Sequence, residues 1–378
     1  MSDDTENTKQ SSKLRRGWTT GACATAATKA ALTALATGSF PDPVEITLPK
    51  GQKTAFALDY EDIQENQAEV GIVKDAGDDP DVTHGALVKA KVRFGARGDG
   101  IRFFAGEGVG TITRAGLPLP VGEPAINPVP RQMMTEVVNE LASKYDFAPD
   151  MDITISVRNG EKLAKHTWNP RLGIVGGLSI LGTTGVVIPF SCSAWIHSIH
   201  RGIDVARAEK LPHVAGCTGS TSEKAVRQLY ELPDFAMLDM GDFVGGMLKY
   251  LRTHPVPRIT IGGGFAKLSK LAQGHMDLHS GRSQVDFDWM AERIAELGGD
   301  DQMQQQARDA NTALAVLQMA DAAGLDIANK IAQLAKARAL DILRNPDAAL
   351  DIVIVSRKGD IIARAGQDTE PKGHSQDA

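Results

Sequence analysis

The sequence predicts a two-domain protein in which a mostly antiparallel α+β domain precedes a largely parallel, three-layer α/β domain. The chain has 378 residues, more than the roughly 250–300 residues at which a single hydrophobic core stops growing. Short strands separated by Pro, Gly and Asp turns fill the first part, whereas strands alternate with helices further on. We therefore expect the α+β domain at residues 14–145 and the α/β domain at residues 146–365.

The first domain should contain two helices and a set of short strands. The segment Ala22–Thr37 is rich in Ala, and Gly38 follows where a left-handed helix end belongs. Pro128 and Pro130 begin a second helix that runs to about Lys144. The β-branched runs expected as strands are Val44–Leu48, Val70–Val73, Leu87–Phe94 and Ile101–Phe104.

The second domain should alternate strands and helices, a pattern typical of a parallel α/β sheet. The strands expected here are Ile153–Val157, Ile174–Val175, Phe235–Leu238 and Ile259–Ile261. The helices expected here lie near residues 193–208, 221–230, 242–252 and 265–273. Residues 302–344 are rich in Gln and Ala and should be helical, and Ile352–Val355 with Ile361–Ala363 should form a strand or hairpin.

Composition and charge narrow the classes of function. The formal net charge is -6, so no overall positive field exists to hold nucleic acid or an anionic membrane. No apolar run reaches the ~18–20 residues needed to span a bilayer, and the start of the chain lacks the apolar segment of a secretory signal. The three cysteines are not in CxxC spacing. We expect a cytoplasmic protein with disordered polar tails at residues 1–13 and 366–378.

Four segments place glycine and threonine or serine where a strand or coil meets a helix. Backbone N–H groups at such junctions bind phosphate or carboxylate oxygens, helped by the helix dipole. Tight turns with helix caps have the same composition, so both interpretations stay open. The segments are Thr19-Thr20-Gly21, Gly182-Thr183-Thr184-Gly185, Gly216-Cys217-Thr218-Gly219-Ser220-Thr221 and Gly262-Gly263-Gly264.

The densest polar run, Lys74–Gly85, follows a predicted strand and holds four carboxylates within seven residues. Such a set of oxygen ligands suits Mg²⁺ or Ca²⁺. The alternative is that the carboxylates cap backbone donors in turns. A further hypothesis has Asp75 or His84 facing the reacting group as a proton acceptor. The four carboxylates are Asp75, Asp78, Asp79 and Asp81.

Two proline-containing loops, Asn127–Arg131 and Asn169–Arg171, each end with an arginine. Proline fixes the approach of the chain, and a guanidinium offers a planar fork that suits a carboxylate. Arg131 and Arg171 are therefore candidate anchors for an acidic ligand. Ordinary surface ion pairs would explain them equally well.

Several long motifs stand out in the sequence: Arg16–Ala24, Lys74–Gly85, Gly106–Gly110, Ala125–Arg131 and the block from Asn169 through Gly185. Together these motifs resemble the cobalt-precorrin-5B C1-methyltransferase family of cobalamin biosynthesis. The resemblance extends over roughly Leu14 to Ser283, with two departures: Asp242 stands where Asn is expected, and Leu278-His279-Ser280 where Thr-His-Ser is more usual.

The resemblance implies methyl transfer from S-adenosylmethionine to C1 of cobalt-precorrin-5B, giving cobalt-precorrin-6A, with cobalt present only as part of the substrate. A flat corrinoid with many acidic side chains needs an apolar floor and several carboxylate anchors. Thr19, Thr20 and the Gly182–Gly185 loop, with Arg131 and Arg171, are the expected anchors. The number of subunits stays open, a homo-oligomer included.

The methyl donor should bind where open α/β sheets bind ligands, outside the carboxyl ends of parallel strands. Two predicted junctions qualify, Asp239-Met240-Gly241 and Gly262-Gly263-Gly264. An Asp after a strand is able to accept hydrogen bonds from two ribose hydroxyls, although Asp239 would serve equally well as a helix cap.

Two other classes of function stay open. A phosphoryl-transfer enzyme would hold Mg²⁺ on the acidic run and phosphate on the glycine loops, although no GxxxxGK[ST] pattern occurs. A non-catalytic corrinoid carrier would use the same anchors without a donor site. The histidine pairs His197/His200 and His275/His279 have spacings that permit a metal, but solvated or loop hydrogen bonding explains them better, so we expect no metal site.

Overall fold

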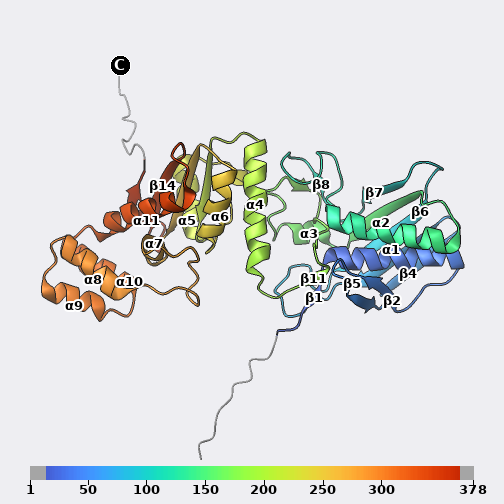
Figure 1. The fold of residues 1–378 in the computed structure, drawn as a ribbon, viewed down its shortest axis with the longest axis horizontal. Helices are drawn as coiled ribbons and strands as arrows, with labels where there is room; N and C mark the ends of the chain where they lie inside the picture. Colours follow the sequence, from blue (N-terminus) through green and yellow to red (C-terminus); the bar gives the residue numbers. More distant parts are fainter. Residues whose placement is uncertain (1–13, 367–378) are drawn as a thin grey trace, which may run out of the picture. The chain divides into compact units, whose positions relative to one another are not determined.

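The computed structural model describes residues 14–366, which form two compact units (Figure 1). Unit 1 comprises the chain up to Arg114 together with Pro118–Ser191, and unit 2 comprises Ala115–Leu117 and the chain from Cys192 onward. The tails expected at residues 1–13 and 366–378 lie outside the described residues, apart from Gly366.

Unit 1 is an α+β unit built on a five-stranded sheet. Neighbouring strands are antiparallel except β9 and β7, which are parallel. The strand order is β4 (Tyr60–Gln64), β5 (Gln67–Val73), β6 (Leu87–Phe94), β9 (Met151–Val157) and β7 (Ile101–Ala105). The mostly antiparallel first unit that the sequence predicts is thus present.

Helices α1 (Thr20–Thr37) and α2 (Pro128–Tyr145) pack against each other, and α1 also packs on β5 and β6 (Figure 1). The buried face of α1 consists largely of Ala, which lets the helix approach both neighbours closely. The buried side chains of this unit are largely apolar, among them Val70, Val88 and Ile155. Burial of this apolar surface is the main stabilising contribution of the unit.

Short strand pairs join distant parts of unit 1. The most important pairs β1 (Gly17–Trp18) with β11 (Val186–Val187), which brings the start of α1 beside the loop that precedes β11. The others are β2 (Val44–Thr47) with β3 (Lys53–Phe56) and β8 (Thr111–Ile112) with β10 (Ile174–Val175), and α3 spans Gly160–Ala164.

Unit 2 is a three-layer α/β unit. Its sheet has the order β12 (His213–Cys217), β13 (Arg258–Gly264), β14 (Ala349–Val355) and β15 (Ile361–Ala365). The first three strands are parallel and β15 is antiparallel. Helix α5 (Ser220–Tyr230) packs on one face through Ala225 and Val226.

The other face of this sheet carries the larger core, to which Ile259, Ile261 and Ile352 contribute. The helices that supply its remaining apolar side chains are α4 (Cys192–Ala208), α6 (Val244–Thr253), α7 (Phe265–Ala272), α8 (Phe287–Glu296), α9 (Asp301–Arg308), α10 (Ala313–Ala322) and α11 (Ile327–Leu343). The largely parallel second unit is therefore also as the sequence predicts. None of the helices in residues 14–366 combines the length and the apolar character that crossing a bilayer requires.

The boundary between the units differs from the expected one between residues 145 and 146. Strand β9, expected to open the second domain, instead inserts between β6 and β7 and pairs with β6 over its full length. Strand β10 also belongs to unit 1, so the main crossing lies between Ser191 and Cys192. The strand pattern was right, but a pattern does not reveal the pairing partner.

Two local expectations in unit 2 are also corrected. Phe235–Leu238 was expected as a buried strand, but Asp234–Ala236 is a short 3-10 helix and only Met237 bridges Ala215 in parallel. Strand β12 was not expected, because Ala215, Gly216 and Cys217 are small residues without β-branching.

Candidate functional site

The start of α1 and the Gly182–Gly185 loop form one hydrogen-bonded junction in unit 1. The Thr19 hydroxyl accepts the N–H of Ala22 at 3.1 Å and caps the helix. The Thr20 hydroxyl accepts the N–H of Leu181 at 3.0 Å and donates to its carbonyl at 3.2 Å. Both threonines are buried. Their hydroxyls hold the loop on the helix, so direct contact with a ligand stays a prediction that these bonds do not support.

The two glycines of the loop are required by close packing. Gly182 has φ +138°, and a Cβ there would lie 2.2 Å from the Thr19 hydroxyl oxygen. Gly185 has φ +78°, and a Cβ there would lie 2.6 Å from Leu48. Positive φ values favour glycine whatever the surroundings. The fold alone therefore explains both glycines.

The threonines of the loop differ in exposure. Thr183 is exposed, whereas the Thr184 hydroxyl forms a local turn by donating to the carbonyl of Val186 at 3.1 Å and accepting its N–H at 3.3 Å. Of the four loop residues, Thr183 is thus the one whose side chain is open to a ligand.

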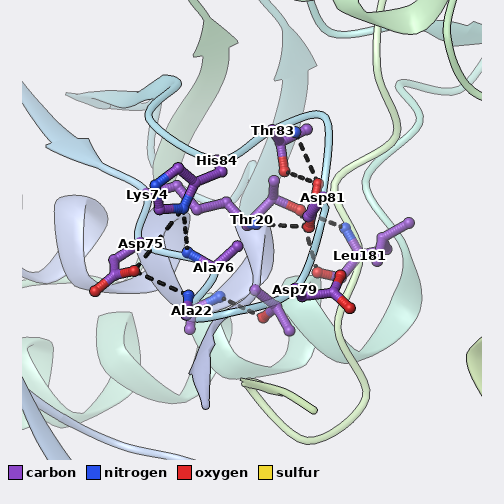
Figure 2. A network of polar contacts seen from close by, with 12 residues as sticks. Thr20, Ala22, Lys74, Asp75, Ala76, Asp79, Asp81, Thr83, His84 and Leu181 are labelled. Atoms are coloured by element: carbon purple, nitrogen blue, oxygen red, sulfur yellow. Dashed lines mark hydrogen bonds and ion pairs between the residues drawn. The ribbon is translucent and has the colours of Figure 1, made fainter. Parts of the chain in front are cut away.

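The acidic run folds over this junction, with the carboxylates of Asp75 and Asp81 on opposite sides of the loop (Figure 2). All four carboxylates of the run are hydrogen-bonded. Each accepts a backbone N–H, from Gly77 to Asp75, from Arg15 to Asp78, from Phe190 to Asp79 and from Thr83 to Asp81. Among residues 14–366 no group of three His, Cys, Asp or Glu side chains is arranged to hold a metal ion. This geometry favours the capping interpretation over a Mg²⁺ loop.

The Lys74–Asp81 ion pair, which is largely buried, holds the acidic run in place. The Lys74 ammonium lies 2.7 Å from Asp81, and its side chain is 1% exposed. Burial alone would raise the pKa of Asp81, but the Lys74 ammonium and the Thr83 donors outweigh it and hold that pKa below its usual range. The sequence analysis missed this pair, since a lysine beside four carboxylates does not reveal that it is buried.

Asp75 is poorly suited to act as a base. The Arg15 guanidinium forms two hydrogen bonds with its carboxylate, one of them 2.9 Å long. Together with the N–H of Gly77, this arginine lowers the pKa of Asp75 to about 2. A carboxylate with so low a pKa accepts a proton weakly near neutral pH. Asp75 as a catalytic base therefore stays a prediction without support from its surroundings.

His84 presents a hydrogen-bond donor at the surface. Its Nδ1 accepts the N–H of Ala76 at 3.1 Å, so in the neutral ring the proton is on Nε2 (Figure 2). The side chain is 53% exposed. An exposed Nε2–H donates to a carboxylate rather than accepting a proton, which favours His84 as an anchor over His84 as a base.

The two candidate arginines also lie in unit 1. The Arg131 guanidinium donates to the carbonyls of Ile126 at 2.8 Å and Pro124 at 3.0 Å, and to the carboxylate of Glu123 at 2.9 Å. These bonds hold the chain that enters α2. Arg171 is partly exposed in the turn before β10. Carboxylate anchoring by either arginine stays a prediction, and the contacts of Arg131 favour a structural role.

The carboxyl edge of the sheet in unit 2 contains a topological switch point. From β12 the chain runs through α5 to Met237, which bridges the outer side of β12. From β13 it runs through α7 and the following helices to β14 on the opposite side. Connections that leave two adjacent parallel strands in opposite directions open a crevice between their carboxyl ends, where ligands bind in open α/β sheets.

The residues expected to hold the methyl donor all lie on this edge. Asp239 and Gly241 have φ values of +47° and +55°, and the N–H of Gly241 donates to the carbonyl of Cys217 at 3.0 Å. The indole N–H of Trp195 donates to the Asp239 carbonyl at 2.8 Å and holds this turn. Left-handed backbone at a non-glycine residue is costly, and such positions concentrate at ligand sites.

The three glycines at the end of β13 differ from one another. A Cβ on Gly262 would lie 2.8 Å from the Cys217 sulfur, and one on Gly263 would lie 2.9 Å from the Thr218 hydroxyl. The fold therefore explains these two. Gly264 is open, since the nearest atom to its Cβ position is the Val355 carbonyl at 4.0 Å. Donor binding by Gly262 and Gly263 stays a prediction, whereas the surroundings of Gly264 leave room for a ligand.

A second ion pair that the sequence analysis missed ties the loops of this edge together. The Lys267 ammonium lies 2.7 Å from Asp242 and donates to the Thr218 carbonyl at 3.2 Å. Lys267 belongs to the first turn of α7, Asp242 follows Gly241, and Thr218 follows β12. The pair was not predictable, because these residues meet only once the strands are in register.

Comparison with protein families covers most of the chain. A family model described as CbiD matches residues 7–189, and a model described as CbiD, C-terminal domain, matches residues 277–366. A curated protein named Cobalt-precorrin-5B C(1)-methyltransferase, from Brucella anthropi, is 61% identical over 96% of this chain and 100% of its own length. The chain belongs to the CbiD family.

Further CbiD relatives carry the same name. The protein from Brucella canis is 59% identical over 96% of this chain and 100% of its own length, and that from Paramagnetospirillum magneticum is 60% identical over 93% and 98%. A crystal structure of the cobalamin biosynthesis protein cbiD from Archaeoglobus fulgidus is 24% identical, covers 82% of this chain and 85% of that one, and has a TM-score of 0.37.

The two CbiD family models match some of the candidate residues and leave others between the matched ranges. The first match, residues 7–189, contains the whole junction of α1, the acidic run and the Gly182–Gly185 loop. The second begins at residue 277, so Asp242 and Lys267 lie between the matched ranges.

Proposed function

We propose that this chain transfers a methyl group from S-adenosylmethionine to C1 of cobalt-precorrin-5B and so produces cobalt-precorrin-6A. The observation that carries the proposal is the 61% identity, over nearly the whole chain, to a relative named for this reaction. The three cysteines lie far apart in the sequence and have no CxxC spacing, which fits a reducing compartment, and we propose the cytoplasm as the site of action.

The chemistry of the carboxyl edge of unit 2 fits the methyl donor. S-adenosylmethionine when bound supplies a methyl group already activated by its sulfonium, so no side chain has to act as a nucleophile. The edge offers the Asp239 carboxyl for ribose hydroxyls, open backbone at Gly264, and opposite charges on Asp242 and Lys267. The donor carries hydroxyls and both charges, which is why this set of groups suits it.

The junction in unit 1 supplies groups that suit a corrinoid. Two large apolar side chains next to it are exposed, Leu181 at 51% and Phe190 at 66%, and in this proposal they supply apolar surface for the flat ring. The Phe190 N–H is fixed by Asp79 at 2.8 Å. The Nε2–H of His84 and the Thr183 hydroxyl are polar donors for acidic side chains of the ring.

The role of the protein is then to align the donor methyl with the ring carbon and to keep water away. Orientation of this kind is worth roughly 7–11 kcal/mol of barrier lowering in well-aligned reactions. Neither Asp75 nor a metal ion is needed for it. The carboxylates of the acidic run cap backbone N–H groups, which argues against a Mg²⁺-dependent phosphoryl-transfer enzyme. The groups at the carboxyl edge of unit 2 suit a methyl donor, which argues against a corrinoid carrier that binds no donor.

Calorimetric titration separates these functions. S-adenosylhomocysteine should bind with a stoichiometry of one per chain, and ATP with Mg²⁺ should give no heat beyond dilution. A chelator should leave the first titration unchanged. Binding of ATP that depends on Mg²⁺ would favour phosphoryl transfer. Binding of a corrinoid without any binding of S-adenosylhomocysteine would favour a carrier.

A further inference from the structure

The carboxyl edge of unit 2 holds an ion pair whose polar groups are only partly used. Lys267 and Asp242 approach to 2.7 Å, with side-chain exposures of 38% and 19%. An ammonium has three N–H bonds. One of them donates to the Thr218 carbonyl, and the ammonium forms an ion pair with Asp242. The ammonium therefore keeps donor capacity toward the open side of the pair.

The carboxylate of the pair has unused acceptor capacity. The contact with Lys267 lies outside hydrogen-bond angles, and no donor among the described residues forms a hydrogen bond to the buried Oδ1 of Asp242. Buried polar atoms are almost always hydrogen-bonded in folded proteins. The 2.7 Å contact with Lys267 balances the charge of this oxygen without a hydrogen bond, so the carboxylate keeps capacity to accept from a donor that a ligand brings.

The neighbouring charged groups are occupied elsewhere. Asp277 and Arg282 form a two-bond ion pair with each other, one of its bonds 3.2 Å long. The Lys270 ammonium donates to the Leu278 carbonyl at 3.1 Å and is buried. Lys267 and Asp242 are thus a partly exposed pair of opposite charges at the switch point between β12 and β13.

We infer that the Lys267–Asp242 pair recognises the amino-acid end of the methyl donor, with Lys267 facing its α-carboxylate and Asp242 its α-ammonium. This inference rests on the proposed function, from which it takes the class of ligand. In this arrangement the α-carboxylate of the ligand faces the Lys267 ammonium, and its α-ammonium faces the Asp242 carboxylate. Each of the four charges then has a partner of opposite sign. A ligand with only one of the two charges would leave one member of the pair without a partner.

Two ligands that differ only in this end test the inference. S-adenosylhomocysteine carries the amino-acid group, and 5′-methylthioadenosine lacks it. The variants are Lys267→Met and Asp242→Leu. The matched control is Arg227→Met, because Arg227, on α5 of the same unit, forms a half-exposed ion pair with Asp234. Binding is measured by calorimetry, and folding of each variant by circular dichroism and thermal melting.

Each variant of the pair should weaken S-adenosylhomocysteine about ten- to a hundredfold, the equivalent of one lost charge-assisted hydrogen bond. Methylthioadenosine should bind each variant as it binds the unchanged protein, within about twofold, and Arg227→Met should change neither ligand. Equal losses for both ligands, or no loss for either in a folded variant, would overturn the inference. If the unchanged protein binds neither ligand, the proposed function itself fails, and the inference with it.

Discussion

The Nδ1 atom of His84 accepts the backbone N–H of Ala76 at 3.1 Å. This bond fixes the tautomer of the neutral ring, so the exposed edge of His84 is a donor. It also distinguishes two roles that the sequence alone leaves equal, since a proton acceptor and a carboxylate anchor need opposite tautomers.

His84→Phe should therefore weaken corrinoid binding more than it slows the chemical step. We expect KM for the corrinoid to rise about tenfold, the value of one hydrogen bond to a charged group, with kcat lowered less than threefold. His84→Gln, which keeps an N–H donor, should restore most of the affinity. Steady-state kinetics with varied corrinoid test this. A large fall in kcat at unchanged KM would instead mark His84 as a base.

Lys74→Met should destabilise unit 1 strongly, because it leaves Asp81 without its buried counter-charge. Loss of one member of a buried pair costs about 3–5 kcal/mol. The control is Lys53→Met. The ion pair of Lys53 with Glu45 is more than half exposed on both sides, so its loss should change the stability little. Urea unfolding measures both. Adding Asp81→Asn to Lys74→Met should recover stability, and if it lowers stability further, the pair is not the source of the effect.

The stability of unit 2 should fall as the pH falls from about 6.5 to about 4. Burial, with the nearby charge of Arg258, lowers the pKa of His213 to about 4, and its Nε2 lies 2.8 Å from the Thr260 hydroxyl. The unfolded chain has a histidine pKa of about 6.5, so it binds the proton first in this window and unfolding becomes easier. The stabilisation is complete above pH ~6.5 and is lost as the folded pKa is approached.

His213→Gln should flatten this dependence, measured as the free energy of unfolding between pH 4 and pH 7. The unchanged protein, unfolded at the same pH values, serves as the comparison. An identical slope in the unchanged protein and in His213→Gln would show that other groups cause the loss.

The sequence predicts local elements well and their partners poorly. The bounds of β6 coincide with the expected Leu87–Phe94, because apolar residues alternate with charged ones over this segment and turn residues lie on both sides of it. Strand β9 was also recognised, yet it belongs to the first sheet and not to the second. Pairing between distant strands depends on three-dimensional packing, which a local pattern does not contain.

The same contrast holds for the candidate site, where the sequence predicts segments but not the contacts between them. The sequence predicts site residues at Thr19, Thr20, the acidic run and the Gly182–Gly185 loop, and the structure joins these segments in one junction. It does not reveal that the hydroxyls and most carboxylates there serve the fold. The pairs Lys74–Asp81 and Lys267–Asp242 were missed, because burial and long-range contact decide their importance.

The most direct test of the account is methyl transfer itself. The purified protein is incubated with cobalt-precorrin-5B and S-adenosylmethionine that carries an isotopically labelled methyl group, and the corrinoid is analysed by mass spectrometry and NMR. We predict one labelled methyl per ring, attached at C1, with one S-adenosylhomocysteine formed for each ring converted. Unchanged corrinoid beside intact S-adenosylmethionine, or a label on any other ring carbon, would contradict the account.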